Sequence, residues 1–227
     1  MKNQSVPGEV FLGFDQTKNS FSCKSLLDTG TPVRQEFRET KMEETRRHLG
    51  FELDKPLVLI LGGSQGSRGV NRLVTEALQG IYELQVLHLS GAQDLDDVRN
   101  AYAERQSLSQ AYEFFSDMPC AVGAATLSVS RAGASSLAEL AAAGVPSIII
   151  PLPGSVDQHQ LANAAAVVES GGGVLIEERE TSPGQLASII SGIITDRKRC
   201  ESMSLSMRQL DRPEAAKVIA KRIMELM

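Results

Sequence analysis

Short apolar runs alternate with helical patterns along the chain from Pro56 onward. Leu57–Leu61 and Ile148–Leu152 have the length of strands, whereas in 134–143 the apolar residues recur at helical spacing. This alternation is typical of an α/β fold with a doubly wound parallel sheet. It predicts strands near residues 57–62, 85–89, 112–115, 126–130, 147–151 and 173–176, and helices near 68–79, 94–106, 134–143, 158–169, 184–195, 197–208 and 213–226.

Residues 1–35 do not follow this pattern. Val10–Phe14 predicts a strand, but Thr29–Arg34 further along reads as a turn or linker and not as its partner. We interpret residues 1–35 as the end of a preceding domain plus an interdomain linker, and residues 36–227 as one α/β domain. An unpaired strand of this kind is expected to expose an edge and to promote self-association.

Composition excludes several classes of protein. The net charge is −5 with scattered basic residues, and there are only 3 Tyr, 7 Phe and no Trp, so nucleic acid is not an expected partner. No apolar stretch approaches the roughly 20 residues that a membrane span needs, and no signal peptide core follows Met1. The three cysteines form no CxxC pair, which fits neither a disulfide framework nor a zinc site. A reducing, cytosolic compartment is therefore expected.

A glycine-rich turn, Gly62-Gly63-Ser64-Gln65-Gly66, follows the first strand of the α/β pattern. At a strand-to-helix turn, free backbone N–H groups and the helix dipole favour an anion such as phosphate. The turn lacks the GxGxxG dinucleotide fingerprint, and no acidic residue ends the second strand at His88-Leu89-Ser90. It is no Walker loop either, since no Gly-Lys-Ser/Thr follows. A tight turn that only lets helix and strand pack remains the alternative.

A second helix start, Gly133-Ala134-Ser135-Ser136, offers small residues and two hydroxyls to a diphosphate. However, Ser136 and Glu139 also have the spacing of a capping box, in which Glu139 would merely accept from a backbone N–H. Against this, Glu139 falls opposite the apolar stripe of the helix, on the side of Ser135 and Ser136. There it would accept from a ribose diol, at roughly 1.5–3 kcal/mol per charged hydrogen bond. The residues alone leave these two interpretations evenly balanced.

A third polar cluster, Asp157-Gln158-His159-Gln160 with Asn163, follows a buried strand. Open α/β sheets bind ligands at the carboxyl ends of their strands, which favours a hydroxyl-binding role for this cluster. Asp157 can instead act as a simple N-cap, and His159 as a surface residue.

The other two histidines have no comparable context. We interpret His88 as a strand-packing residue and His48 as solvent-exposed. Neither has a nearby Ser or Cys in a triad-like arrangement, and no His, Asp and Glu grouping has metal-ligand spacing.

Together these motifs closely resemble the C-terminal half of the MurG family, the peptidoglycan N-acetylglucosaminyltransferases that make lipid II. Thr29–Arg34 resembles the interdomain Thr-Gly-Asn-Pro-Val-Arg of that family. The resemblance covers nearly the whole chain. It rests on five motifs in one order: Gly62–Gly66, Glu113–Met118, Ser130–Ala134, Glu139–Ala141, and Asp157 through Asn163-Ala164.

The resemblance implies a GT-B fold, in which the second of two Rossmann-like domains holds the nucleotide-sugar donor. By position it assigns the uracil edge to the backbone of Phe115, the ribose hydroxyls to Glu139, and the cleft to Arg34. The remaining implied contacts are Ser64, Ala134, Ser135 and Ser136 around the diphosphate, and His159 and Gln160 near the GlcNAc hydroxyls.

The implied reaction is an inverting attack by the muramyl 4-hydroxyl of lipid I on the anomeric carbon of UDP-GlcNAc. It uses no catalytic metal and no cofactor, because helix dipoles and backbone donors would stabilise the departing UDP. The full-length family is cytoplasmic and peripheral on the inner face of the cell membrane.

Three departures from the family pattern bear on this expectation. Thr31 replaces the usual Asn, and Gln158 stands where many members have a second acidic residue. The acceptor-binding N-terminal domain, with its Gly-rich, His-containing loop and the proposed base, has no match here. We therefore expect a donor-binding half that needs an N-terminal domain for turnover. The alternatives are a non-catalytic UDP-GlcNAc-binding subunit of a two-chain transferase and a UDP-GlcNAc 2-epimerase.

Overall fold

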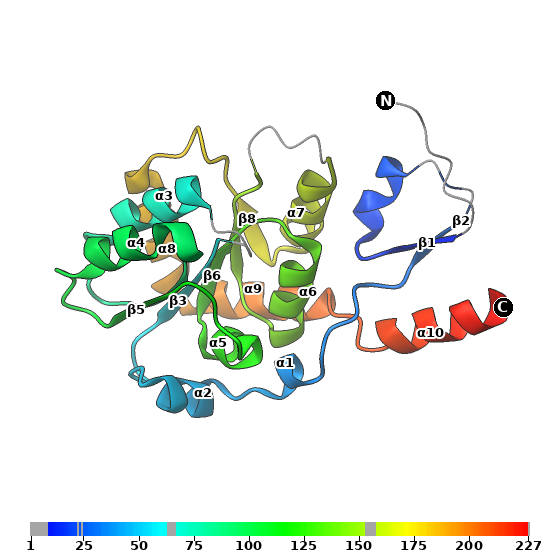
Figure 1. The fold of residues 1–227 in the computed structure, drawn as a ribbon, viewed down its shortest axis with the longest axis horizontal. Coiled ribbons are helices and arrows are strands. Elements are labelled where there is room, and N and C mark those ends of the chain that lie inside the picture. Colours follow the sequence, from blue (N-terminus) through cyan, green and yellow to red (C-terminus); the bar gives the residue numbers. More distant parts are fainter. Residues whose placement is uncertain (1–8, 22, 24, 63–66, 153–157, 227) are drawn as a thin grey trace.

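A six-stranded parallel sheet forms the centre of the molecule (Figure 1). The structure is a computed structural model that describes residues 9–21, 23, 25–62, 67–152 and 158–226. The strand order is β5-β4-β3-β6-β7-β8, and every neighbouring pair is parallel. The strands are β3 (Leu57–Leu61), β4 (Gln85–Leu89), β5 (Ser109–Tyr112), β6 (Leu127–Ser130), β7 (Ser147–Ile149) and β8 (Gly173–Leu175).

Helices cover both faces of this sheet, so its strands are buried on both sides. Along β3, Leu57, Leu59 and Leu61 pack into one core, whereas Val58 and Ile60 pack into the other. The first core is closed by α1 (Glu36–Glu39), α2 (Met42–Leu49), α5 (Met118–Ala124), α6 (Ala134–Ala143) and α7 (Gln158–Ser170). The second is closed by α3 (Arg68–Leu78), α4 (Leu95–Tyr102) and α8 (Pro183–Ile194), and α9 (Arg197–Gln209) contributes to both.

Two elements differ from the sequence prediction. The strand expected at 112–115 is β5 at Ser109–Tyr112, and Phe114 beyond it is 73% exposed. The aromatic pair that resembled a strand therefore lies past the end of an edge strand. Helix α5 was not predicted because it has only seven residues, although Asp117 caps it by accepting from the backbone N–H of Cys120 at 3.1 Å.

The N-terminal segment forms a second, small sheet, so the expectation of an unpaired strand was wrong. Strand β1 (Glu9–Leu12) pairs in parallel with β2 (Ser25–Asp28), and the 3-10 helix η1 (Asp15–Ser20) lies between them in the chain. The sequence did not reveal β2 because its four residues include only two apolar ones.

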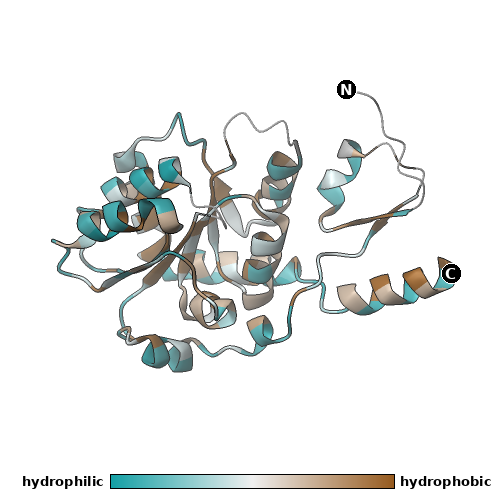
Figure 2. Cartoon of the chain, viewed as in Figure 1, coloured by the Kyte–Doolittle hydropathy of each residue, from teal (hydrophilic) through white to brown (hydrophobic). Residues whose placement is uncertain are grey.

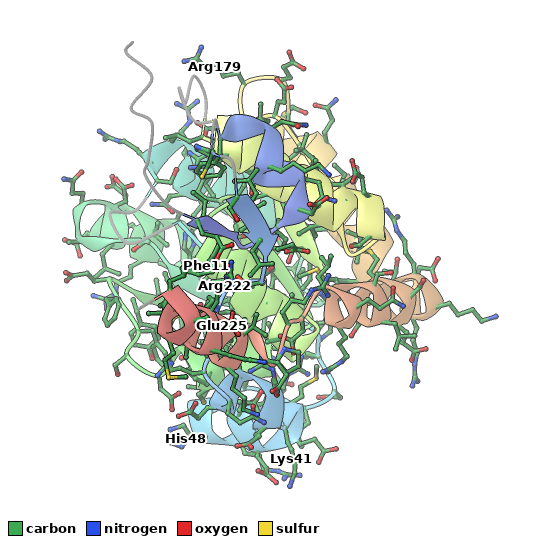
Figure 3. All side chains as sticks on the ribbon, turned by 90° about the vertical axis from the view of Figure 1, so that its right-hand side faces the viewer. Phe11, Lys41, His48, Arg179, Arg222 and Glu225 are labelled. Atoms are coloured by element: carbon green, nitrogen blue, oxygen red, sulfur yellow. The ribbon has the colours of Figure 1, made fainter. Side chains whose placement is uncertain are left out.

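The C-terminal helix α10 (Ala215–Leu226) returns to this small sheet. Arg222 donates to both carboxylate oxygens of Glu9, at 2.6 and 3.1 Å. Figure 3 shows Arg222, Glu225 and Phe11 together on this side of the molecule. Among the described residues, only Ala215 of α10 is fully buried, and Figure 2 shows hydrophobic positions along the helix. None of the described helices is both long and apolar enough to cross a membrane.

Candidate functional site

The two strands that lead into the glycine-rich motifs, β3 and β6, lie side by side at the middle of the sheet. Strand β3 pairs with β4 on one side and with β6 on the other, and Leu61 is opposite Ser130 where β3 and β6 end. The chain thus builds outward from β3, returns, and starts again at β6. Such a topological switch point is where open α/β sheets leave a crevice for ligands. Residues 63–66, including the predicted diphosphate contact Ser64, lie outside the described residues.

The start of α6 is free of the capping box that the sequence allowed. Gly133 is the N-cap, so Ser136 is already in the third helical position, and no side chain caps this end. The first amides of an α-helix have no acceptor within the helix, so those of Ala134, Ser135 and Ser136 form a ready anion site. A Cβ at Gly133 would contact only the Ser136 hydroxyl, at 3.8 Å. The packing of the described residues therefore does not explain the glycine, whereas close approach of a ligand would.

Glu139 lies on the accessible side of α6, with Ser135 and Ser136. It is half-buried, and none of the described residues donates a hydrogen bond to it. Burial raises the pKa of the Glu139 carboxyl, and the positive charge of Arg34 partly opposes that rise. Arg34 is itself exposed, with its guanidinium 5.3 Å above the ring centre of Phe37. A carboxylate without a donor partner is thus held beside a cation.

Phe115 lies at the carboxyl end of the sheet, just beyond β5. Its ring packs edge-on against Tyr112, with 5.3 Å between ring centres. Phe115, Ala134 and Val33, which precedes Arg34, all pack against the same apolar core. The predicted uracil, diphosphate and cleft residues are therefore brought to one side of the sheet.

The start of α7 joins this edge, with its polar residues in different roles. Gln160 accepts from the backbone N–H of Leu152 at 3.0 Å, and the ring of His159 lies 5.0 Å from that of Phe21. Asn163 is buried and donates to the backbone oxygen of Ala132 at 3.0 Å, so its amide fixes α7 to the turn before α6. Asp157 and the side chain of Gln158 lie outside the described residues.

His88 belongs to a buried hydrogen-bond network that sequence reasoning missed. Asn71 donates through Nδ2 to the Ser90 oxygen at 2.9 Å and to Asp94 at 2.8 Å, so its Oδ1 must accept from His88 Nε2 at 3.0 Å. Nδ1 of His88 then accepts from the Tyr102 hydroxyl at 2.9 Å. Burial lowers the pKa of His88 to about 3, which keeps the ring neutral. This network supports the packing role predicted for His88.

Arg131 is the other important residue to which the sequence assigned no role. It directly follows β6, and its side chain is 12% exposed. A nearly buried arginine is rare unless it is paired, and here it contacts Glu178 and three other residues. Its position inside the motif Ser130–Ala134 was the only signal available.

Comparisons with known proteins agree with this geometry. The family model described as Glycosyltransferase family 28 C-terminal domain matches residues 57–223. The UDP-N-acetylglucosamine--N-acetylmuramyl-(pentapeptide) pyrophosphoryl-undecaprenol N-acetylglucosamine transferase of Myxococcus xanthus is 35% identical over 222 residues, which is 96% of this chain and 57% of that protein. The protein of the same name from Listeria welshimeri is 34% identical, over 96% of this chain and 61% of its own length. The chain thus spans less than two thirds of either relative.

Solved structures show the same fold. The crystal structure of Acinetobacter baumannii MurG matches with a TM-score of 0.76 at 26% identity, over 96% of this chain and 65% of that one. UDP-GlcNAc 2-epimerase from Neisseria meningitidis matches with a TM-score of 0.57 at 12% identity, which shows a likeness of fold alone. The parallel sheet and these matches place the chain in the glycosyltransferase family 28 C-terminal domain family, as the Rossmann-like second domain of a GT-B glycosyltransferase.

Proposed function

We propose that this chain is the donor-binding half of an inverting transferase that moves GlcNAc from UDP-GlcNAc to lipid I and so makes lipid II. The observation that carries the proposal is the uncapped start of α6 at the β3–β6 switch point, with Glu139 on the same helix accepting no hydrogen bond from the described residues. A nucleotide-sugar has a diphosphate that can accept hydrogen bonds from the first backbone amides of α6. It also has a ribose diol that can donate hydrogen bonds to the carboxylate of Glu139.

The donor would lie across the carboxyl edge of the sheet. The backbone of Phe115 reads the uracil edge, Glu139 accepts from the ribose hydroxyls, and the amides of α6 bind the diphosphate together with Ser64. Gln160 uses its oxygen to accept from Leu152, which leaves its NH₂ group to donate to a GlcNAc hydroxyl. His159 lies next to Gln160, and Arg34 borders the cleft.

Transfer would draw on the same groups. As the bond to the anomeric carbon breaks, negative charge grows on the departing UDP, and the fixed amide dipoles at the start of α6 stabilise that charge. Such donors are already oriented by the helix, so they need no reorganisation during the reaction.

The acceptor side would be supplied by the part of the relatives that this chain does not match. We assign residues 1–35 to that side and residues 36–227 to the donor domain. The small sheet β1–β2 supports this, because two strands do not make a stable sheet by themselves, and α10 exposes apolar residues beside it. The acceptor half, on the same polypeptide or on a partner chain, would bring the catalytic base and contact the inner face of the cell membrane.

Calorimetric titration with UDP-GlcNAc tests the proposal. We expect binding by the chain alone, no transfer to lipid I, and a loss of about tenfold or more in affinity for Glu139→Ala, since a charged hydrogen bond contributes roughly 1.5–3 kcal/mol. Glu201→Ala, on the exposed side of α9, serves as the control and should bind normally. Absence of UDP-GlcNAc binding, or equal affinities for Glu139→Ala and the unchanged chain, would refute the assignment.

A two-chain transferase is the second candidate, favoured by the exposed apolar positions on α10. In that case this chain binds the donor without catalysis until the acceptor half joins it. Co-expression with a separately encoded Gly-rich, His-containing half, followed by co-purification and a transfer assay, separates the two candidates.

A further inference from the structure

Arg131 fastens together several segments at the carboxyl edge of the sheet. Nη1 donates to the backbone oxygens of Ile150 and Pro151, at 3.1 and 2.9 Å. Nη2 donates to Oε2 of Glu178 at 2.6 Å and to the Ser67 hydroxyl. One planar guanidinium therefore holds four partners in fixed relative positions, which a lysine ammonium could not reproduce.

Along the chain, these partners flank the two segments that contain predicted donor contacts, residues 62–66 and residues 152–160. Ser67 is the N-cap of α3 and directly follows the first glycine turn, and its hydroxyl is engaged by Arg131 and does not cap the helix. Ile150 and Pro151 follow β7 and lead to Leu152, whose N–H is the partner of Gln160. Arg131 thus links Ser67, which follows residues 62–66, to Ile150 and Pro151, which precede residues 152–160.

Glu178 completes the arrangement from beyond β8. Its side chain is 19% exposed, and its carboxylate lies against Gly69 in the first turn of α3, where a Cβ would overlap it. A negative charge is favourable at a helix N-terminus, so Glu178 both neutralises Arg131 and anchors α3. Gly69 is required here because the carboxylate occupies the space of a side chain.

We propose that Arg131 and Glu178 are positioning residues for donor binding, because they fix Ser67 at the start of α3 relative to Ile150 and Pro151 after β7. The pair does not itself touch the donor in this proposal. It determines where the diphosphate and sugar contacts lie, and it leaves the uracil and ribose contacts at Phe115 and Glu139 unaffected. This inference rests on the proposed donor binding.

The test compares Arg131→Lys with a matched control, Arg46→Lys. Arg46 is 3% exposed and likewise donates to backbone oxygens, those of Leu53, Lys55 and Ala124, but it lies at the opposite end of the sheet. Each variant is titrated with UDP-GlcNAc and with UMP, which keeps the uracil, the ribose and one phosphate but lacks GlcNAc and the second phosphate. Amide hydrogen exchange in 67–71 is measured without ligand.

Arg131→Lys should raise the Kd for UDP-GlcNAc by about tenfold, which is the loss of affinity expected when one charged hydrogen bond is misplaced. The same substitution should raise the Kd for UMP by less than about twofold. Glu178→Gln, which retains an acceptor for Arg131, should show a smaller change in the same direction. Exchange in 67–71 should accelerate in Arg131→Lys and not in Arg46→Lys, whereas both variants should melt at lower temperature.

Several results would overturn the inference. Equal losses for UDP-GlcNAc and UMP, or the same losses in Arg46→Lys, would mean that Arg131 only stabilises the fold. Unchanged exchange in 67–71 would show that the pair does not fasten α3. If the unchanged chain bound UMP but not UDP-GlcNAc, this inference would fail, whereas binding of neither ligand would refute the proposed function itself.

Discussion

At the scale of one residue, Glu139, the proposed ribose contact, is a half-buried acidic group that lowers the stability of the fold. Its carboxylate is half-buried and accepts no hydrogen bond from the described residues, and burial raises its pKa. A raised pKa in the folded state means that the folded chain binds protons more readily than the unfolded one. The ionised form of Glu139 therefore opposes folding at pH values above its ordinary pKa.

We predict that Glu139→Gln melts at a higher temperature than the unchanged chain at pH 7 while binding UDP-GlcNAc more weakly. The amide removes the buried charge, but it accepts from the ribose diol as a neutral group.

In the unchanged chain, donor affinity should fall as the pH is lowered through the raised pKa of Glu139. Scanning calorimetry at pH 7 and titrations from pH 7 to 5 measure these effects; a lower melting temperature for Glu139→Gln would contradict the argument.

His88 illustrates the opposite case, a buried group that is fully paired. Its pKa is about 3 in the folded chain against an ordinary value near 6.5, because burial disfavours the charged ring. Below pH 6.5 His88 is protonated in the unfolded chain but stays neutral in the folded chain. The contribution of neutral His88 to the stability of the fold is therefore complete above pH 6.5 and is lost as the pH falls toward 3.

We predict that the free energy of unfolding falls below pH 6.5 with a contribution from His88 of up to about 1.4 kcal/mol per pH unit. His88→Gln should remove this part of the slope, although it lowers stability at pH 7 by disturbing the network. Urea unfolding at pH 7, 6 and 5 measures both. His48→Gln is the control for the substitution itself, because His48 is exposed on α2 (Figure 3) and takes no part in this hydrogen-bond network.

At the scale of elements, α10 and the strands β1 and β2 form the least covered part of the fold. Val218, Ile223, Met224 and Leu226 of α10 are all exposed, Met224 to 69%. Exposed apolar residues gathered on one helix are typical of a surface that another protein segment covers. Among the described residues, the ion pair of Arg222 with Glu9 holds α10 to the small sheet.

We predict that the chain alone self-associates through this surface and that the double substitution Ile223→Lys and Met224→Lys weakens the association. Sedimentation velocity over a range of concentrations measures it. Leu205→Lys replaces a comparably exposed apolar residue on α9 and should leave the association unchanged. A chain that stays monomeric at the highest concentration would disprove the prediction.

At the scale of the whole molecule, the large sheet and the small sheet have unequal support. The central strands β3 and β6 are buried on both faces, and every residue of each is buried. The small sheet reaches the main body through η1 beside α7 and through Phe14, which packs in the first core. The ion pair of Arg38 with Asp211, at 2.7 Å, joins α1 to the segment between α9 and α10.

Native-state hydrogen exchange should therefore divide the chain into two regions. We predict that amides of β1, β2 and α10 exchange through local opening, at least about tenfold faster than those of β3 and β6, which need global unfolding. Mass spectrometry of peptide fragments measures this. Equal protection of α10 and β3 would show that α10 and the large sheet unfold as one unit.

The sequence by itself determined most of the elements. Five of the six strands of the large sheet lie where the sequence predicted them, because strands covered by helices on both faces are rich in apolar residues, although β4 and β6 also bury polar side chains. Short elements were harder: β2 and α5 have too few residues for a periodic pattern, and β5 at the sheet edge is less apolar. A capping box between Ser136 and Glu139 would require Ser136 to be the N-cap of α6. The helix instead begins three residues earlier, with Gly133 as its N-cap, so the capping box does not form.

Only the tertiary structure decided which of these elements meet. Strand order depends on the crossovers, which no local pattern records, so the neighbouring positions of β3 and β6 could not be derived from periodicity. The same holds for Arg131, whose partners lie between 19 and 64 positions away in the sequence. Hydrophobic patterning is a local property of the chain, whereas a site built from the ends of several strands depends on contacts that form only when the sheet is assembled.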